Sequence, residues 1–308
     1  MLGQLHYREL TGMSNDNSLA PTPQEKSAAW RAFGLFMALM LGLSCVFYAM
    51  MISQGAMNML TVTGIMWSPG LAAILCCLIL KRPVASLPWR WGAWKWNWQA
   101  YLLPVVYGLI MYLPVWLFGL GGSAFGDPDT LSGFAAIVAG PSEHPATFAI
   151  IGGIILTATL GMASSISRAL GEEIGWRGFM IWEMRKVMPF WAVGLLSGLI
   201  WSLWHWPGIL FTDYNAGEGN QVLQMALFTL GVMPMGVVYA WFVFRSKSLW
   251  PAAILHASHN LFLQRIYTPL TARGENTHFY IDEFGILLPI VSVVLAVIFL
   301  FKAKKDGF

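Results

Sequence analysis

Long apolar runs recur from one end of this 308-residue chain to the other. A run of about 20 apolar residues is long enough for a helix to cross the roughly 30 Å hydrocarbon core of a membrane. Because lipid offers the backbone no hydrogen bonds, such runs should form helices, which satisfy their own polar groups. Only 11% of the residues are charged, whereas soluble domains contain about 25%. The sequence therefore predicts an all-α, polytopic membrane bundle, and it lacks the alternating segments of a membrane β-barrel.

Eight segments have the length and the apolar character of membrane-spanning helices. The predicted spans are 32–52, 60–80, 99–119, 147–169, 190–211, 222–244, 250–265 and 284–301. The seventh is short and carries polar side chains, so we expect it to lie inside the bundle rather than against lipid. Residues 1–30 are polar, which predicts a flexible cytosolic tail ahead of one membrane domain at 31–303. The motifs that could carry out chemistry fall within residues 150–265 of that domain.

The distribution of Lys and Arg orients the predicted spans. Short connections on the cytoplasmic side of a membrane are enriched in these residues. If the N-terminus lies inside, only Arg265 and Arg273 of the 18 Lys and Arg fall on outer segments. This split predicts that both termini are cytoplasmic.

An aromatic run, LPWRWGAWKWNW at 87–98, fits a segment at the membrane interface, where indole rings collect. Its only basic residues are Arg90 and Lys95, so we expect no nucleic acid partner. The three cysteines lie in apolar runs and form no CxxC pair, which argues against disulfides and thiolate metal sites.

The stretch GEEIGWRGF, residues 171–179, places ionisable groups between two apolar runs. Such a group at membrane depth costs about 2.5–3.5 kcal/mol, so it usually has a partner and a function. On a helix, Glu173 and Arg177 are spaced i,i+4 and can pair, whereas Glu172 is rotated away from them. A carboxylate outside the pair is suited to act as a general base. Alternatively, all three lie in cytosolic water beyond the span and are only structural.

A second candidate is His205, in the stretch WSLWHWPG at 201–208. A lone histidine at such a position is more often a core residue or an interfacial anchor than a catalyst. Glu172 and His205 are, however, equidistant from a turn near residue 188. In an antiparallel hairpin they would lie at similar height, roughly 24 Å above that turn. This geometry predicts that the two side chains meet in the cytosolic half of the membrane.

A third polar cluster, ILHASHNLF at 254–262, lies in the seventh predicted span. His256 and Asn260 are spaced i,i+4 and share one helix face, which His259 borders. A single polar residue could simply bridge two helices, which is worth about 0.6 kcal/mol. Two histidines and an asparagine together are too costly without partners, so the cluster favours a functional site.

Three common protease motifs are missing from this sequence. It contains no HExxH zinc motif. Leu195 stands where a GxSG serine motif needs glycine, and Ala124 stands where a GxGD aspartyl motif needs glycine. Serine and aspartyl mechanisms are therefore not supported.

Taken together, the three polar stretches resemble the CAAX protease and bacteriocin-processing family, also called the abortive-infection family. It includes the Ras-converting CAAX prenyl endopeptidases. The family signature reads EExxxR, then an aromatic residue four positions before a histidine, then HxxxN. The matching stretches here are 172–177, 201–205 and 256–260, in the same order and on separate predicted helices. Trp201 stands where the family usually has Phe, and the resemblance covers about residues 150–265.

The resemblance implies an intramembrane protease that acts on a membrane-associated peptide or protein, within the lipid bilayer of a bacterial inner (plasma) membrane. Six residues carry the implied roles: Glu172 and His205 to polarise a water, His256 and Asn260 to donate to the oxyanion, and Glu173 and Arg177 to hold the site. These roles agree with the chemistry, because water needs a base and an oxyanion needs fixed donors in a dry site. We expect the active cavity to open on the cytosolic side.

The family is often described as metalloproteases, and Glu172, His205 and His256 could supply a His₂Glu set for zinc. No two of these residues share a helix at ligand spacing, and Asn260 is a better oxyanion donor than zinc ligand. We expect no cofactor, with zinc as the open alternative.

Two other classes of function compete with a protease. The chain could be a catalytically silent immunity or scaffold protein that binds a peptide or partner. It could also be a transporter, since intramembrane charges often mark ion paths. The sequence shows neither the inverted repeat nor the paired broken helices that transporters use, which disfavours the second class.

Overall fold

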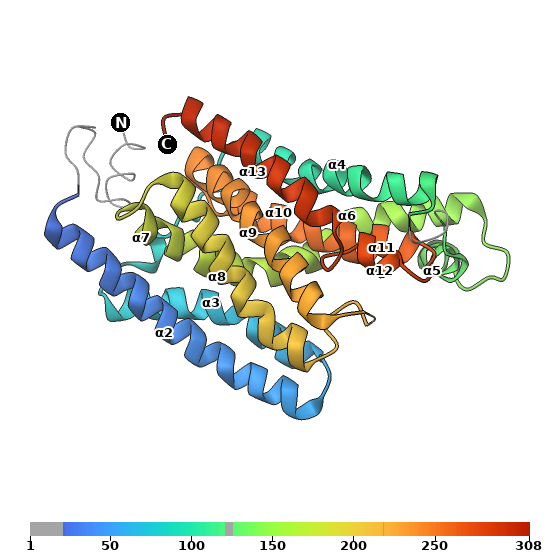
Figure 1. The fold of residues 1–308 in the computed structure, drawn as a ribbon, viewed down its shortest axis with the longest axis horizontal. Helices are drawn as coiled ribbons and strands as arrows, with labels where there is room; N and C mark the ends of the chain where they lie inside the picture. The colour runs from blue at the N-terminus through green and yellow to red at the C-terminus, as the bar shows by residue number, and fades with distance from the viewer. Residues whose placement is uncertain (1–20, 121–125, 218) are drawn as a thin grey trace.

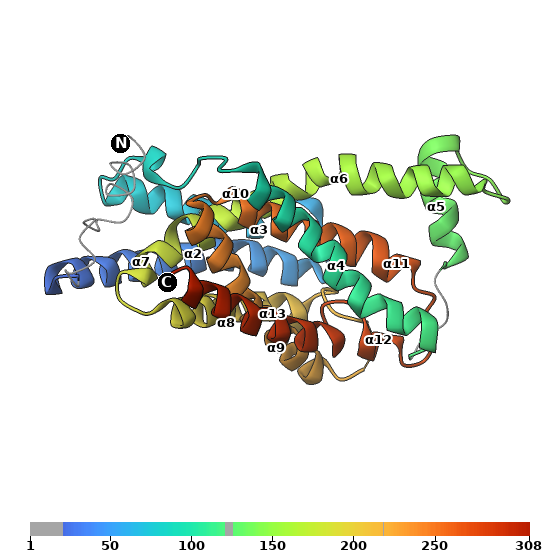
Figure 2. The ribbon, with the colours of Figure 1, turned by 90° about the horizontal axis from the view of Figure 1, so that it is seen from above.

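The computed structural model describes residues 21–120, 126–217 and 219–308 and shows a bundle of long helices (Figure 1). By length and composition, seven of the described helices could cross a membrane. They are α2 (Pro23–Gln54), α3 (Met59–Ile79), α4 (Trp94–Phe118), the continuous Thr147–Arg185, α8 (Phe190–Phe211), α9 (Gln221–Ser246) and α13 (Leu287–Lys305). Most run roughly along the long axis of the molecule (Figures 1 and 2). The predicted polytopic, all-α bundle is confirmed.

The seventh predicted span, 250–265, is helical but is not one of these seven. It begins as α10 (Trp250–His259), continues as a π-helical segment, η3 (Asn260–Tyr267), and ends in α11 (Thr268–Leu270). Residues 251–258 are all buried, and α10 packs against α4, α6 and α9. Its predicted place inside the bundle is confirmed, but only seven of the eight predicted spans form helices of membrane-spanning length and composition.

One helix boundary and one additional helix correct the expectations from the sequence. Residues 23–30, predicted to belong to the tail, form the first turns of α2. Thr22 caps this helix in a reciprocal arrangement with Glu25, and Pro23 has the fixed φ that suits a first helical position. Residues 1–20 of the predicted tail lie outside the described part of the chain. The helix α5 (Pro128–Ala139), which hydropathy did not indicate, packs against α6 (Thr147–Gly175).

Glycines allow helices to approach closely beside the first and the second polar motif. A Cβ atom at Gly171 would lie 2.8 Å from the backbone oxygen of Met66 on α3. On the other side of the bundle, a Cβ at Gly198 of α8 would lie 2.2 Å from the backbone oxygen of Met233 on α9. Small residues at such contacts are typical of helices packed within membranes. They set the height at which the polar side chains of α6 and α8 meet.

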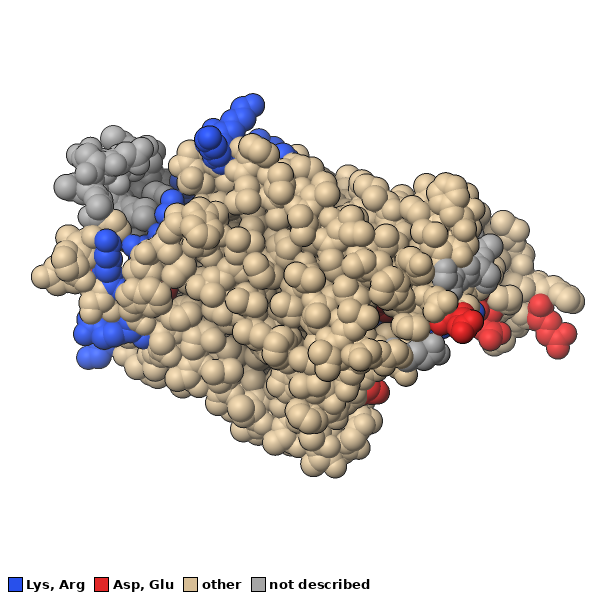
Figure 3. Space-filling view, in the orientation of Figure 1, with Lys and Arg blue, Asp and Glu red and all other residues tan. Residues whose placement is uncertain are grey.

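The two ends of the bundle carry opposite charge. Lys and Arg gather at the end where α2 begins and α13 ends, whereas Asp and Glu gather at the opposite end (Figure 3). Between these ends, the visible face shows hardly any charged side chain (Figure 3). This pattern matches a protein whose middle lies in hydrocarbon and whose ends reach two membrane surfaces.

Candidate active site

The first polar motif lies where an α-helix widens into a π-helix. Glu172 and Glu173 stand at the end of α6, and Arg177 follows in the π-helical segment η2 (Trp176–Met180), before α7 (Ile181–Arg185). Such π-helical turns are frequent at functional sites. The three side chains are 1%, 0% and 0% exposed. The alternative that they lie in water beyond the span is therefore wrong.

Glu173 and Arg177 form the ion pair that their spacing predicts. Arg177 Nη1 lies 3.1 Å from Glu173 Oε1. The guanidinium carbon lies 4.3 Å from the ring centroids of both Trp201 and Tyr239, within range of a cation–π interaction. His256 Nδ1 lies 2.9 Å from the same carboxylate oxygen. Glu173 thus links the first motif to the third.

Glu172 points away from this pair, as its position on the helix predicts. Trp201 Nε1 donates a hydrogen bond of 2.7 Å to Glu172 Oε2. Hydrogen bonds to a charged acceptor are among the stronger ones in proteins. The aromatic position of the second motif is therefore occupied by a donor that orients the Glu172 carboxylate.

Hydrogen bonds set the tautomers of the two motif histidines. His205 Nδ1 lies 2.8 Å from the backbone oxygen of Trp201. Because a carbonyl oxygen can only accept, Nδ1 carries the hydrogen, and Nε2 of the neutral ring keeps a lone pair. His256 Nδ1 is held in the same way by the Glu173 carboxylate. Each imidazole therefore has Nε2 available for a substrate or a water.

Trp201 contacts three of the predicted site residues: Glu172, His205 and His256. Besides its bond to Glu172, its ring centroid lies 5.8 Å from that of His205 and 5.1 Å from that of His256. Residues from three separate helices thus meet around one indole.

A cavity of about 380 Å³ opens beside this cluster. Glu172, His205, His256 and Asn260 all line it, whereas Glu173 and Arg177 lie behind its wall. Asn260, the first residue of η3, is partly exposed. The structure thus brings together all six residues predicted from the sequence, four at the surface of the cavity and two supporting it.

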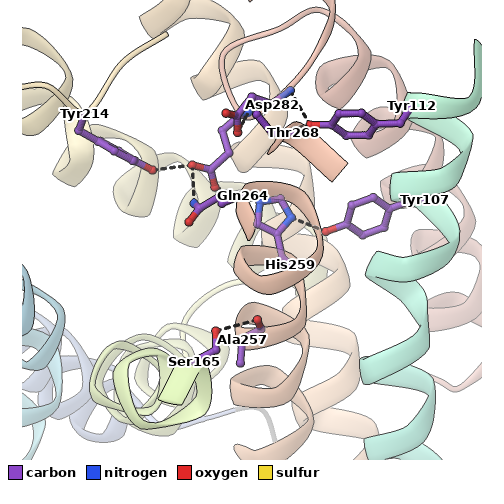
Figure 4. A network of polar contacts seen from close by, with 10 residues as sticks. Tyr107, Tyr112, Ser165, Tyr214, Ala257, His259, Gln264, Thr268 and Asp282 are labelled. Carbon is purple, nitrogen blue, oxygen red and sulfur yellow. Dashed lines mark hydrogen bonds and ion pairs between the residues drawn. The ribbon is translucent and has the colours of Figure 1, made fainter. Parts of the chain in front are cut away.

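Analysis of the sequence missed a second polar network, four residues of which also line the cavity. Its centre is Glu283, in the connection that leads into α13. His259 Nε2 lies 3.0 Å from Glu283 Oε1. Gln264 Nε2 and the Tyr214 hydroxyl donate to Oε2, at 2.9 and 2.7 Å. Figure 4 shows Tyr107 on α4 reaching His259 from the other side.

This network ties the connection before α13 to three other parts of the bundle. Tyr107 lies on α4, His259 ends α10, and Tyr214 belongs to the connection after α8. The Tyr214 ring also lies 6.0 Å from the His205 ring. One signal in the sequence could have revealed the network. Asp282 and Glu283 are adjacent carboxylates just ahead of the last apolar run, in a chain with only 15 acidic residues.

The two neighbouring carboxyl groups titrate in opposite directions. Burial, together with the charge of Glu283, raises the pKa of Asp282 to about 6. Burial alone would also raise the pKa of Glu283, but the hydrogen bonds and charge of His259 and the hydroxyl of Tyr214 outweigh it and lower that pKa to about 2. Glu283 is therefore ionised over the whole range in which Asp282 loses its proton.

The residues do not form a zinc site in this arrangement. Within 21–120, 126–217 and 219–308, no three His, Cys, Asp or Glu side chains are grouped so that they could hold a metal ion. Trp201 already occupies Glu172 Oε2, and Glu173 occupies Nδ1 of His256. The described side chains therefore give no support to the His₂Glu set considered from the sequence, which stays a prediction.

Comparisons with known proteins cover the same part of the chain. Residues 154–262 match the model of a family described as Type II CAAX prenyl endopeptidase Rce1-like. A protein of Methanococcus maripaludis named CAAX prenyl protease 2 is 32% identical over 127 residues. That match covers 40% of this chain and 44% of the relative, so the chain spans less than half the length of the relative it matches. The resemblance predicted from the three motifs is confirmed over this segment.

Proposed function

We propose that this integral membrane protein is an endopeptidase that cleaves a membrane-associated peptide or protein by attack of a water held between Glu172 and His205. The observation that carries the proposal is the meeting of Glu172, His205 and His256 around Trp201, at the wall of one cavity. The matched family and the matched relative are both named as proteases, which supports the same reaction.

In this mechanism, the Glu172 carboxylate takes a proton from the water, whose oxygen attacks the carbonyl carbon of the scissile bond. Trp201 keeps the carboxylate oriented, and Nε2 of His205 holds the water through its lone pair. As the C–N bond breaks, Glu172 returns the proton to the departing amine nitrogen. General acid–base catalysis of this kind contributes typically about 10²–10⁴-fold to the rate.

The negative charge that develops on the carbonyl oxygen needs donors on the other side of the cavity. The Asn260 side-chain amide supplies one. His256 can donate through Nε2 only as an imidazolium, a form that the Glu173 carboxylate stabilises from 2.9 Å away. Arg177 pairs with the same carboxylate, and Glu172 supplies the second negative charge, so two buried cations face two buried anions. Fixed donors of this type are usually the largest single contribution to acyl-transfer catalysis.

The orientation of the protein is part of the proposal. The Lys- and Arg-rich end, which holds the start of α2 and the end of α13, faces the cytoplasm of a bacterial inner membrane (Figure 3). The positive-inside rule supports this orientation, because cytoplasmic connections carry the excess of Lys and Arg.

The test is cleavage of candidate membrane peptides by the purified full chain in detergent, with and without a prenylated cysteine. Glu172→Gln and His205→Ala should each lower kcat/KM by about 10²–10⁴-fold. Glu183→Gln is the matched control, because this buried glutamate pairs with Arg82 and Lys186 away from the cavity. Full cleavage by the first two variants would defeat the proposal.

Two further outcomes of this assay separate the alternatives. Loss of cleavage on addition of a zinc chelator would favour the metal mechanism over the one proposed. A wild-type chain that binds peptides but cleaves none would favour the silent immunity or scaffold protein.

A further inference from the structure

Four residues that line the cavity lie in the connections between helices: Met57 between α2 and α3, Asp213 and Asn215 between α8 and α9, and Asp282 ahead of α13. Met57 and Asp213 are exposed, and Asn215 and Asp282 are partly exposed. We call these four residues the mouth. All three connections lie at the end of the bundle opposite the one that holds the start of α2 and the end of α13 (Figure 1).

Towards the Lys- and Arg-rich end, the site is closed by packed side chains. Trp176, Phe179, Met180 and Ile181 follow the catalytic motif along the helix and are between 0% and 3% exposed. We call them the floor. Phe36 of α2 packs on it, with its ring centroid 5.8 Å from Trp176 and 5.6 Å from Phe179. Interiors packed in this way leave few voids that could hold a water molecule.

The mouth and the charge pattern together decide which side of the membrane the site faces. Lys and Arg crowd the end beyond the floor (Figure 3), and that end faces the cytoplasm by the positive-inside rule. The mouth lies at the other end, where Asp213 and Asp282 contribute carboxylates. Among the described residues that line the cavity, none is Lys or Arg.

We propose that the substrate enters from the outer side of the membrane, so that the cleaved bond belongs to an extracytoplasmic segment of a membrane-associated peptide or protein. The inference rests on the proposed function, because only an active protease has a substrate. The side of the membrane on which the cavity opens does not depend on activity. Peptides confined to the cytoplasm, including lipidated tails on its surface, meet the closed floor and are not substrates.

The expectation that the cavity opens on the cytosolic side differs from this proposal, and the reason is geometric. It placed Glu172 and His205 by their distance from the turn near residue 188. The depth of a site in the membrane depends equally on its distance from the opposite end of each helix. His205 stands six residues before Phe211, where α8 ends, which is only about 9 Å at 1.5 Å per residue.

Thiol labelling in membrane vesicles tests the inference without any substrate. Cys45, Cys76 and Cys77 are first replaced by Ala in the full chain. Met57→Cys then puts one thiol at the mouth, and Lys304→Cys puts one on the exposed opposite end. The hydrogen bond at Met57 uses its backbone nitrogen, so the substitution retains it.

A membrane-impermeant maleimide should label Met57→Cys in right-side-out vesicles and Lys304→Cys only in inverted ones. The reverse pattern would overturn the inference. Labelling of both variants from one side would overturn it as well, because the mouth and the Lys- and Arg-rich end would then share a membrane face.

A third variant tests whether the mouth leads to the site. Met235→Cys lies on the cavity wall beyond the mouth and is not assigned a role in the reaction. A small charged methanethiosulfonate added to right-side-out vesicles should modify it, as read by mass, and should lower later cleavage in detergent at least tenfold. Modification only in inverted vesicles would overturn the inference. If the unmodified protein cleaves nothing, the proposed function fails, while the mass still reports the side of entry.

Discussion

At the scale of single residues, the site depends on a tryptophan whose polar edge matters as much as its apolar faces. Trp201 donates to Glu172, stacks on Arg177 and contacts both motif histidines. Phe, which the related family usually carries at this position, could fill the same space but could not donate. The identity of this residue therefore separates packing from orientation of the catalytic carboxylate.

Replacing Trp201 with Phe should weaken catalysis more than folding. The change removes the indole N–H that donates to Glu172 Oε2, and a hydrogen bond to a charged group is worth about 1.5–3 kcal/mol. We expect kcat/KM to fall by about tenfold to about a hundredfold. The matched control is Trp206→Phe on the same helix, which loses a bond to Thr229 outside the cavity and should retain activity. Equal activity of Trp201→Phe and wild type would show that the donor has no catalytic part.

The Asp282–Glu283 pair makes a prediction about stability and pH. The pKa of Asp282 is raised to about 6 by burial and by Glu283, against about 3.9 in an unfolded chain. Its carboxyl therefore favours folding below pH 4, and this contribution is lost as the pH rises through 6. Asp282→Asn removes the charge, and asparagine tolerates the left-handed backbone here, where φ is 66°.

We expect Asp282→Asn to raise the Tm in detergent by about 2–4 °C at pH 7.5 and by much less at pH 4.5. Glu283, whose pKa is lowered to about 2, contributes stability above about pH 4 that is lost as the pH falls towards 2. That loss is common to both proteins, so the difference between them isolates Asp282. A variant less stable than wild type at pH 7.5 would contradict the assignment.

At the scale of helices, hydropathy predicted where most spans lie, but not how the helices pack against one another. The apolar runs correspond to α2, α3, α4, α6, α8, α9 and α13 because burial in lipid selects for length and apolar character alone. The π-helical turns η2 and η3 and the contact of α5 with α6 left no such signal. They depend on tertiary packing, and no local pattern in the sequence records it.

The same distinction applies to the site. Spacing on one helix predicted the Glu173–Arg177 pair, because i,i+4 neighbours must share a face. It could not predict the bond between Glu173 and His256, which joins residues 83 positions apart. The family resemblance supplied that convergence, whereas Glu283 lay outside the resemblance and was missed.

The glycine contact between α8 and α9 predicts how a single added methyl group changes stability. In Gly198→Ala, the new Cβ would stand 2.2 Å from the backbone oxygen of Met233, so α8 and α9 must separate. Overpacking of this kind typically costs about 1–3 kcal/mol. We expect a lower Tm and weaker cleavage, because α8 carries both Trp201 and His205.

The control for this change is Gly42→Ala on α2, where a Cβ meets nothing within 4 Å. Alanine favours a helix over glycine by about 1 kcal/mol, so this variant should be as stable as wild type or more so. Equal stability of the two alanine variants would show that α8 and α9 are not in close backbone contact.

At the scale of the whole molecule, the short α10 determines whether the chain crosses the membrane an even or an odd number of times. The start of α2 and the end of α13 lie at the same end of the bundle (Figure 1). Seven long helices alone would leave them at opposite ends, so the chain must cross once more. The continuous helical stretch from Trp250 to Leu270 supplies that crossing, since its residues extend about 30 Å at 1.5 Å each. It can do so without an apolar exterior because the other helices enclose it.

This count predicts that both termini lie on one side of the membrane, whichever side that is. With one protease-cleavable tag ahead of Met1 and another after Phe308, added protease should cut both tags in the same kind of vesicle, which is the inverted kind in the proposed orientation. Cleavage of one tag in each kind of vesicle would mean an odd number of crossings. In that case α10 and η3 would re-enter the bundle without traversing the membrane, and His256 and Asn260 would reach the site from a loop folded back on itself. The shared side of the termini is therefore a direct measure of whether the third motif is carried by a true crossing.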